Sequence, residues 1–540
     1  MRRAFLLLVF LAALPVAPAA ASTDRSRGIR LEGTIRERGV ISARPAGNLL
    51  YVSSLTGVSI FDIADPRAPV RVGRLDLPNA QNEDVDVGSG LMLVSDDPFG
   101  GRGILHVIDV RDPTQPRVLS TFSTWAPGLL EFDRVPRSGG IGHTVTCIQA
   151  CRYAWLAGSA AGIDIVDLTD PANPRLATRF PAREAAGLNG THDVQVDPQG
   201  LAWVAGARGT AAYDITDPVR PRLVKHTGAR GRRGPLNDFI HHNSQRIAPG
   251  VVAITEEDFG DRCRRAGTLQ TWRIRRGRVM RPLDSFAVER DGSSRVMCSA
   301  HYFDARDGLI AQGFYEQGIR IVDARRPARL RQVGYFVRRP ALYWGALWAP
   351  TDPNGSTVYA LDHSRGIDIL SVNRAALRPV RRRGARRTLR NANQGVGMLI
   401  FDGVDRVLPG QRLRIDMAVF GRSRRVRVSA TLPPGLDSVR VPRGVRFDAA
   451  TREVTFTLRG RRQVRVRRIR ARVAPGTAVG TSLEVIGFAR GPGDPLPLDD
   501  RGVDRNEVAT TGDAARATTA AAARRPVRRG FCALPYDYTF

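Results

Sequence analysis

One phrase recurs along this chain and constrains its fold more than any other feature. Its clearest copy is GIDIVDLTDPANPRL, which runs from Gly162 to Leu176. Apolar and polar residues alternate in its first half, which is typical of a β-strand. Asp170 and Pro171 then favour a turn, because Asp can bond its own downstream backbone and Pro removes a backbone donor. The phrase therefore predicts two antiparallel strands joined by an Asp-Pro turn.

The phrase returns at four other places in the chain. These copies are GVSIFDIADPRAPVRVG (residues 57–73), GILHVIDVRDPTQPRVL (103–119), GTAAYDITDPVRPRLV (209–224) and GIRIVDARRPARLRQVG (318–334). A truncated copy, GIDILSVN, occupies residues 366–373. A period of roughly 40–50 residues is typical of propellers and solenoids. Aligning the copies on their turns gives seven units of about four strands, which favours an all-β chain with a seven-bladed β-propeller over residues 28–373.

The two ends of the repeat series indicate a closed ring. The last unit stops after its third strand, because GIDILSVN is not followed by a strand of the PRLVG kind. A spare strand-like segment, IRLEGTI at Ile29–Ile35, lies before the first unit. We expect it to supply the missing outer strand of the last blade and so to protect its edge. The alternative is that this segment is a disordered leader.

The repeat also resembles a known family. The pattern (I/V)D(I/V)xDPxxPxxVG, preceded by a strand similar to AYVAG, resembles the LVIVD repeat of secreted bacterial propeller proteins. The resemblance covers about residues 28–373, and four copies keep both the Asp-Pro pair and a second proline. It implies an exported propeller and little more about function.

The character of the chain changes after the repeats. Residues 374–394 are rich in arginine and are predicted to form a linker. Residues 395–511 contain short alternating strands separated by Pro-Gly turns, which predict a β-sandwich. The phrases LPPGLD and APGTAVGTSLEV resemble the Ig-like domains of bacterial surface proteins, which implies a spacer or adhesive module. Residues 512–540 are rich in Ala, Thr and Arg and are predicted to be disordered.

The N-terminus and the cysteines predict export. Two arginines, an apolar run over residues 5–16 and three alanines at 19–21 are typical of a secretory signal peptide, assigned to residues 1–21. We find no second apolar stretch long enough to span a membrane, so the protein is expected to be secreted or associated with the cell surface. Cysteines persist as disulfides in such oxidising spaces. The candidate pairs are Cys147 with Cys151 and Cys263 with Cys298, which leaves Cys532 over.

The charge of the chain bears on its partners. The formal net charge is +30, and all but one of the 82 basic residues are arginine, spread over the whole length. A functional basic surface would favour anionic cell-wall polymers or membranes over nucleic acid, and nucleic acid is not expected as a partner. The expected partner is a protein, a cell-wall polymer or a small molecule, and the chain is expected to be a monomer.

Histidines recur at one position of the repeat. His143, His192, His242 and His301 each stand at the start of the first strand of a unit, and these strands meet at one mouth of a propeller channel. The second strands return to the same mouth, where Glu256, Glu257, Asp362 and His363 are found, and His241 is a further weaker candidate. Imidazole and carboxylate groups that converge in this way suit zinc or another transition metal.

Two interpretations of this ring remain open. Propeller repeats can reuse a polar residue to bond the backbone of the neighbouring blade, which would make the histidines structural. In that case the protein is an exported binding scaffold. Alternatively it is a metal-dependent enzyme, with the four histidines as ligands and Glu256 or Glu257 as a proton acceptor or fifth ligand. A four-histidine channel site is loosely similar in architecture to that of the metal-dependent propeller thiol oxidases once called selenium-binding proteins.

Overall fold

The structure is a computed structural model, and it describes the chain in segments. The described residues are 23–37, 39–77, 84–96, 104–123, 143–159, 162–181, 191–228, 241–257, 263, 267–288, 298–339, 341–380, 396–401, 406–421, 425–459, 464–491, 501–508 and 510. The expected signal peptide (1–21), the expected tail (512–540) with Cys532, and residues 381–394 of the expected linker lie outside them.

The strands before residue 373 form four-stranded antiparallel sheets, one of which gains a fifth strand. The first sheet contains β3 (Val40–Ala46), β4 (Leu49–Ser54), β5 (Gly57–Asp62) and β6 (Val70–Asp76). The second contains β7 (Val85–Gly88), β8 (Leu91–Asp96), β9 (Ile104–Asp109) and β10 (Arg117–Ser123). The third contains β11 (Thr144–Ile148), β12 (Tyr153–Ser159), β13 (Gly162–Asp167) and β14 (Arg175–Phe180).

The same strand order continues in the next four sheets. The fourth contains β15 (Asp193–Val196), β16 (Leu201–Gly206), β17 (Gly209–Asp214) and β18 (Arg222–His226). The fifth contains β19 (His241–Ala248), β20 (Val251–Glu256), β21 (Leu269–Arg273) and β22 (Arg281–Phe286). The sixth contains β23 (Phe303–Arg306), β24 (Leu309–Gly313), β25 (Ile319–Asp323) and β26 (Arg331–Arg338), with β1 (Thr23–Arg25) at its edge. The seventh contains β27 (Tyr343–Trp348), β28 (Thr357–Asp362), β29 (Gly366–Val372) and β2 (Ile29–Ile35).

The repeated phrase forms the third and fourth strands of a sheet, as expected. In the third sheet, β13 ends and the Asp-Pro turn leads into β14, which pairs with it in antiparallel register. Asp170 Oδ1 accepts a hydrogen bond from the backbone N–H of Ala172 at 3.1 Å. Equivalent bonds run from Arg67 N–H to Asp65 and from Val219 N–H to Asp217. These turns lie far from the first strands, so they determine strand order and do not line the centre of the unit.

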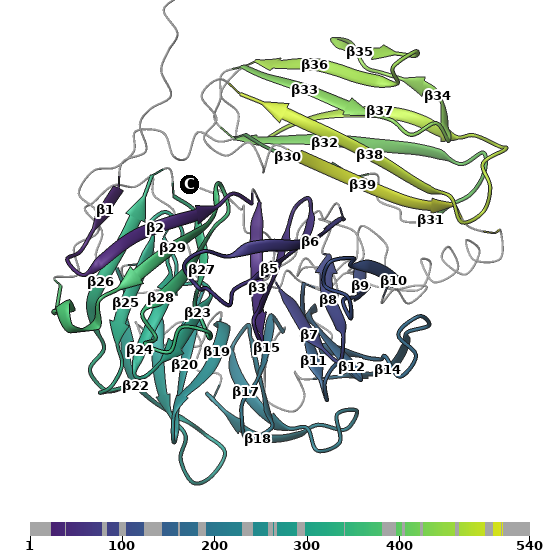
Figure 1. Ribbon diagram of the computed structural model, residues 1–540. Coiled ribbons are helices and arrows are strands. Elements are labelled where there is room, and N and C mark those ends of the chain that lie inside the picture. Colours follow the sequence, from purple (N-terminus) through teal and green to yellow (C-terminus); the bar gives the residue numbers. More distant parts are fainter. Residues whose placement is uncertain are drawn as a thin grey trace, which may run out of the picture.

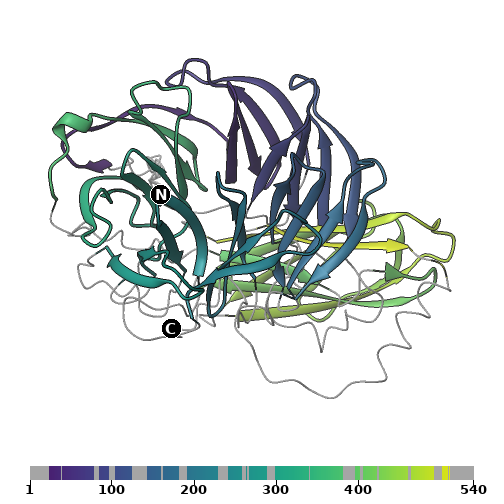
Figure 2. The ribbon, with the colours of Figure 1, turned by 90° about the horizontal axis from the view of Figure 1, so that it is seen from below.

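The first strands of the sheets lie around a common centre (Figures 1 and 2). Each contacts the next in the cycle β3, β7, β11, β15, β19, β23, β27 and back to β3. Apolar side chains fill the spaces between neighbouring sheets, and three tryptophans, Trp155, Trp203 and Trp272, are fully buried there. Sheets that radiate from a centre with their first strands innermost form a β-propeller.

The segment before the first sheet completes the last one. Strand β2 pairs antiparallel with β29, from Ile29 opposite Val372 to Ile35 opposite Ile367. The prediction that this segment supplies the missing outer strand is confirmed. Directly after β29, the side chain of Asn373 accepts hydrogen bonds from two backbone N–H groups of a 3-10 turn, η1 (Arg374–Ala376).

The strands after residue 395 form a second all-β unit. One sheet contains β30 (Val396–Phe401), β32 (Arg412–Gly421), β37 (Val464–Val473) and β34 (Leu436–Arg440). The other contains β31 (Arg406–Val407), β39 (Arg501–Val508), β38 (Ser482–Arg490), β33 (Arg425–Thr431), β36 (Glu453–Arg459) and β35 (Val445–Asp448). Alternate residues of both sheets, such as Ile415, Met417, Val428 and Ile469, are buried in one shared apolar core. Two sheets with a common core are the arrangement of a β-sandwich.

Both expected disulfides are present in the structure. Cys147 is bonded to Cys151, and Cys263 is bonded to Cys298. Cys151, Cys263 and Cys298 are 1–2% exposed, so the sulfurs lie within the packed structure.

Removal of the longer disulfide is expected to cost more stability than removal of the shorter one. A crosslink restricts the unfolded chain more when it closes a longer loop, and the two bonds span 35 and 4 residues. The variant Cys263→Ser with Cys298→Ser should lose about 4 kcal/mol, and Cys147→Ser with Cys151→Ser about 2 kcal/mol. Denaturant unfolding of the two double variants measures the difference, and equal losses would contradict the loop-length argument.

Candidate metal centre

The propeller register brings the four predicted histidines to equivalent places. The backbone N–H of His143 bonds Ala157 O, that of His192 bonds Ala205 O, and that of His301 bonds Gly313 O, at 2.8–3.1 Å. In each case the partner lies near the end of the second strand of the same sheet. His242 is the second residue of β19, where the pairing with β20 shifts register. The repeat therefore delivers one imidazole from each of four successive sheets to the same mouth.

The four imidazoles follow one another in a continuous row. Ring centroids lie 4.6 Å apart for His143 and His192, 4.2 Å for His192 and His242, and 4.0 Å for His242 and His301. The Nε2 atoms of His143 and His192 are 3.1 Å apart, within hydrogen-bond distance. His242 and His301 are fully buried, and His192 is 8% exposed.

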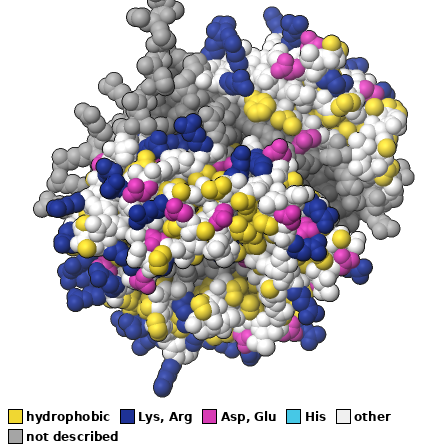
Figure 3. Space-filling model, viewed as in Figure 1, with side chains coloured by type: hydrophobic (Ala, Val, Ile, Leu, Met, Phe, Trp, Pro, Cys, Tyr) yellow, Lys and Arg dark blue, Asp and Glu magenta, His cyan; other side chains and the backbone are white. Residues whose placement is uncertain are grey.

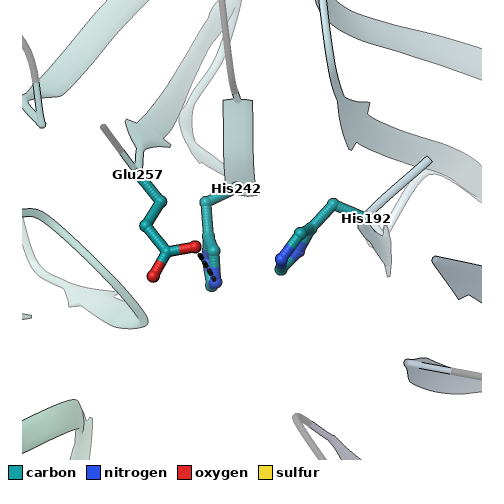
Figure 4. Close-up of side chains that lie close together, drawn as sticks. All are labelled: His192, His242 and Glu257. Carbon is teal, nitrogen blue, oxygen red and sulfur yellow. Dashed lines mark ion pairs between the residues drawn. The ribbon is translucent and has the colours of Figure 1, made fainter. Parts of the chain in front are cut away.

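One carboxylate joins this row. Glu257 follows β20 directly, and its Oε2 lies 3.9 Å from Nε2 of His242 while its Oε1 lies 3.8 Å from Nε2 of His301. Candidate ligand atoms of His192, His242 and Glu257 all lie within 4.8 Å of one another, with His242 between the other two (Figure 4). We call the four histidines and Glu257 the histidine cluster.

Neighbouring groups orient the members of the histidine cluster. Nδ1 of His301 lies 2.7 Å from the backbone carbonyl oxygen of Trp344, so it is the donor of that hydrogen bond. The opposite ring nitrogen then faces Glu257, and such a backbone bond is a common way to fix the tautomer of a metal ligand. The hydroxyl of Tyr315 donates a hydrogen bond to Oε1 of Glu257. The structural role considered for the ring thus holds for one nitrogen of His301 and is compatible with metal binding by the other.

The weaker sequence candidates lie outside the histidine cluster. Nδ1 of His241 lies 2.8 Å from the hydroxyl of Thr210 in the neighbouring sheet, and Oε2 of Glu256 accepts the backbone N–H of Gly267 at 3.0 Å. Asp362 accepts a backbone N–H from Leu342 and bonds from Ser364 and Arg365. Nδ1 of His363 lies 3.2 Å from Val40 O, and its ring stacks on Trp344 at 4.9 Å. Of the two glutamates considered, the structure places Glu257 beside the histidines.

Two carboxylates and one amide are buried at the beginning of first strands. Asp84 directly precedes β7, Asp193 begins β15 and Asn243 is the third residue of β19, and each is at most 6% exposed. Burial raises the pKa of Asp84 well above its usual range, and the Asp193 carboxylate raises it further. Burial also raises the pKa of Asp193 to about 7, against the opposing effect of a hydrogen bond from Asn243. We call these three residues the oxygen layer.

The repeat register also places several of these residues at the mouth. Tyr315 follows a second strand, where the register expects residues of the mouth, and its backbone bonds Tyr343 in the next sheet. Asp193 and Asn243 carry a clearer signal, since each directly follows a histidine of the ring at the same register. Polar residues that alternate along the first strands of consecutive repeats would have pointed to the oxygen layer.

The donor set of the histidine cluster decides which ions it suits. Neutral imidazole nitrogens together with one carboxylate suit zinc, copper, iron and nickel, and three protein ligands leave a position for water or substrate. The cluster contains such a set in His192, His242 and Glu257, with a further histidine on either side. These residues fit the zinc or transition-metal site expected from the sequence.

The comparisons with known proteins concern the fold. The model of the LVIVD repeat matches residues 152–181. A search of curated proteins finds no match. Among solved structures, the Pseudomonas aeruginosa periplasmic gluconolactonase is 12% identical, with a TM-score of 0.43 over 54% of this chain and 84% of that one. A Lactobacillus plantarum protein is 8% identical, with a TM-score of 0.43 over 67% of this chain and 96% of that one.

The matched residues can be located in the fold. Residues 152–181 contain β12, β13 and β14 of the third sheet, including the clearest copy of the repeated phrase and its Asp-Pro turn. The described residues form strands and one short 3-10 turn, and none of them forms a helix that could span a membrane.

The family match and the sheets together show an all-β chain that carries the LVIVD repeat in a β-propeller.

Proposed function

We propose that this chain is an exported binding protein whose ligand site is the histidine-lined mouth of a seven-bladed propeller, where a zinc or transition-metal ion is held. The observation that carries the proposal is the convergence of His192, His242 and Glu257 within 4.8 Å, from two sheets of the ring. A metal held by three protein side chains keeps a coordination position for a further ligand.

Seven blades are supported by the sheets themselves. Each of the seven sheets before residue 373 has its first strand in the closed cycle of contacts, and β2 completes the seventh sheet. The second unit, residues 395–511, is proposed to be an Ig-like sandwich that acts as a spacer or adhesive module. Its two sheets with a shared core support this assignment. The two disulfides support an oxidising compartment, hence secretion or a cell-surface location.

The charge on one face of the described residues is mixed in sign. On the face shown in Figure 3, Lys and Arg side chains are interspersed with Asp and Glu. Several arginines form ion pairs, including Arg179 with Asp164 and Arg468 with Asp416. We therefore place the ligand, a protein, a cell-wall polymer or a small molecule, at the mouth and not on an arginine surface.

The proposal predicts that metal stabilises the protein. Adding Zn²⁺ at about 100 times its Kd to chelator-treated protein should stabilise the fold by about 2.7 kcal/mol, because the ion binds the folded state alone. This corresponds to a rise in Tm of roughly 5–10 °C. The shift should become smaller as the pH falls, because a protonated imidazole cannot bind metal. Protein that contains no stoichiometric metal after purification and shows no metal-dependent rise in Tm would rule the proposal out.

A metal-dependent enzyme is the second candidate, and the position of Glu257 favours it. This carboxylate contacts two histidines and accepts a hydrogen bond from Tyr315, so it is placed to take a proton from a bound ligand. Metal-dependent turnover of a small thiol or ester, lost in Glu257→Gln and kept in Glu256→Gln, would establish catalysis. Metal binding without such turnover supports the binding protein.

A further inference from the structure

The channel holds buried oxygens that the histidine cluster does not use. Asp84 directly precedes Val85, which pairs with Val94, the fourth residue of its second strand. Asp193 directly precedes Val194, which pairs with Val204, again the fourth residue of its second strand. The two carboxylates therefore occupy the same position in the second and fourth sheets. Asn243 follows His242 as Asp193 follows His192, which gives the fifth sheet the same position.

The hydrogen bonds of the oxygen layer hold these groups against one another. The Asn243 amide donates to Oδ2 of Asp193 at 2.8 Å, across the boundary between two sheets. Oδ1 of Asp84 accepts hydrogen bonds from the hydroxyl of Ser42 at 3.3 Å and from the backbone N–H of Val85 at 2.8 Å. These bonds fix the orientation of each side chain while leaving one further oxygen on Asp84 and on Asn243.

Those further oxygens are buried without a hydrogen bond to any described residue. They are Oδ2 of Asp84, whose residue is 6% exposed, and Oδ1 of Asn243, whose residue is 3% exposed. A buried carboxylate or amide oxygen without a hydrogen bond costs free energy unless a ligand or ion satisfies it. Two independent oxygens in equivalent positions of the ring therefore point to a ligand that accepts lone pairs.

The charge balance of the channel indicates that the ligand is a cation. Asp84 and Asp193 are two buried acidic side chains, and Arg44 is a cation that acts on both of them. Arg44 is already committed to another partner, because its Nε donates to Oδ1 of Asp86 at 2.7 Å. Arg44 thus serves three buried acidic side chains, Asp84, Asp86 and Asp193, and is paired directly with Asp86.

We infer that the oxygen layer binds a hard divalent cation such as Ca²⁺ through Asp84, Asp193 and Asn243. Carboxylate and amide oxygens are the ligands that calcium prefers, whereas imidazoles are selected by zinc and copper. The inference goes beyond the proposed function, since this site is separate in chemistry from the histidine cluster. The propeller mouth then contains two ion sites of different preference, one of nitrogen and one of oxygen.

Calcium titration of chelator-treated, full-length protein tests the inference. Calorimetry should show binding with a Kd of about 10⁻⁴ M or tighter, in the range of extracellular calcium modules. Terbium luminescence excited through tryptophan should report the same site, and calcium should compete with it. Absence of both signals in the wild type would overturn the inference.

The variant Asp84→Asn separates loss of the site from loss of the fold. It should bind Ca²⁺ at least tenfold more weakly, while its Tm without calcium should rise because the repulsion between Asp84 and Asp193 is removed. Asp76→Asn is the matched control, since it removes a carboxylate whose side chain is 87% exposed, and it should bind calcium as the wild type does. Unchanged calcium affinity in Asp84→Asn would overturn the inference.

A zinc arm of the same experiment keeps the two sites distinguishable. Asp84→Asn should retain the rise in Tm caused by Zn²⁺, because the histidine cluster is intact. Calcium binding without zinc binding would contradict the proposed function and leave the oxygen layer standing. Zinc binding without calcium binding would contradict the inference about the oxygen layer and leave the proposed function standing.

Discussion

Replacing His242 with alanine is expected to weaken zinc binding by at least a hundredfold. Its ring lies between those of His192 and His301, at 4.2 and 4.0 Å, and its Nε2 lies 3.9 Å from Glu257. No other member of the histidine cluster contacts three further members in this way within the described contacts. Mutation of groups that only orient a metal ligand costs 10–100-fold in affinity, and loss of a central ligand should cost more.

The measurement is competition of each variant with a fluorescent zinc chelator, with circular dichroism as a check on folding. His226→Ala is the matched control, because His226 lies at the end of β18, outside the histidine cluster, and should keep wild-type affinity. His241→Ala is a second control, because the ring of His241 forms a hydrogen bond with the hydroxyl of Thr210 and lies outside the histidine cluster. Equal zinc affinity in His242→Ala and His226→Ala would show that the cluster does not hold the metal.

The histidine register could be predicted because it is a property of the repeat. The Asp-Pro turn is recorded locally in the sequence, and its recurrence fixes which residues are equivalent from sheet to sheet. That equivalence alone is enough to bring His143, His192 and His301 to one mouth. The same reasoning assigns the outer strand at Ile29–Ile35, because a closed ring must pair the last edge.

The choice between adjacent residues could not be predicted in the same way. Glu256 and Glu257 are neighbours in sequence, yet Glu256 ends β20 and bonds a loop, while Glu257 follows the strand and faces the histidines. Successive side chains of a strand point to opposite faces, and a shift in register where the strand ends exchanges their roles. Such a shift occurs in the pairing of β19 with β20, between His241 and Ser244, and it decides which of His241 and His242 faces the centre.

The repeat register places Tyr315 at the mouth, but it does not predict the backbone conformation of this residue. Its φ of 48° lies in the left-handed region, which an aromatic residue rarely adopts without help from its surroundings. Two backbone hydrogen bonds with Tyr343 in the next sheet, at 3.0 and 3.1 Å, stabilise this conformation. These bonds between sheets hold Tyr315 where its hydroxyl donates to Glu257.

Replacing residues 29–35 with an alternating Gly-Ser segment of the same length is expected to destabilise the propeller by roughly 4–6 kcal/mol. The segment forms β2, which pairs with β29 over its whole length and contributes Ile29, a residue that is 2% exposed. Burial of an aliphatic side chain contributes about 1.5–3 kcal/mol, and Ile29, Leu31 and Ile35 are all lost in this variant. The edge of β29, where most side chains are buried, would also be exposed.

The effect should appear as a fall in Tm of about 10 °C or more, since 1 kcal/mol corresponds to roughly 2–4 °C in a large domain. The matched control replaces residues 23–25 in the same way. These residues form β1, which also adds to the edge of a sheet, but all three are exposed. The control should change the free energy of unfolding by less than about 1 kcal/mol, because substitutions of exposed residues usually have small effects on stability. If β2 is needed to close the ring, only the first variant should lose stability. Equal Tm values for both variants and the wild type would show that the seventh sheet closes the propeller without β2.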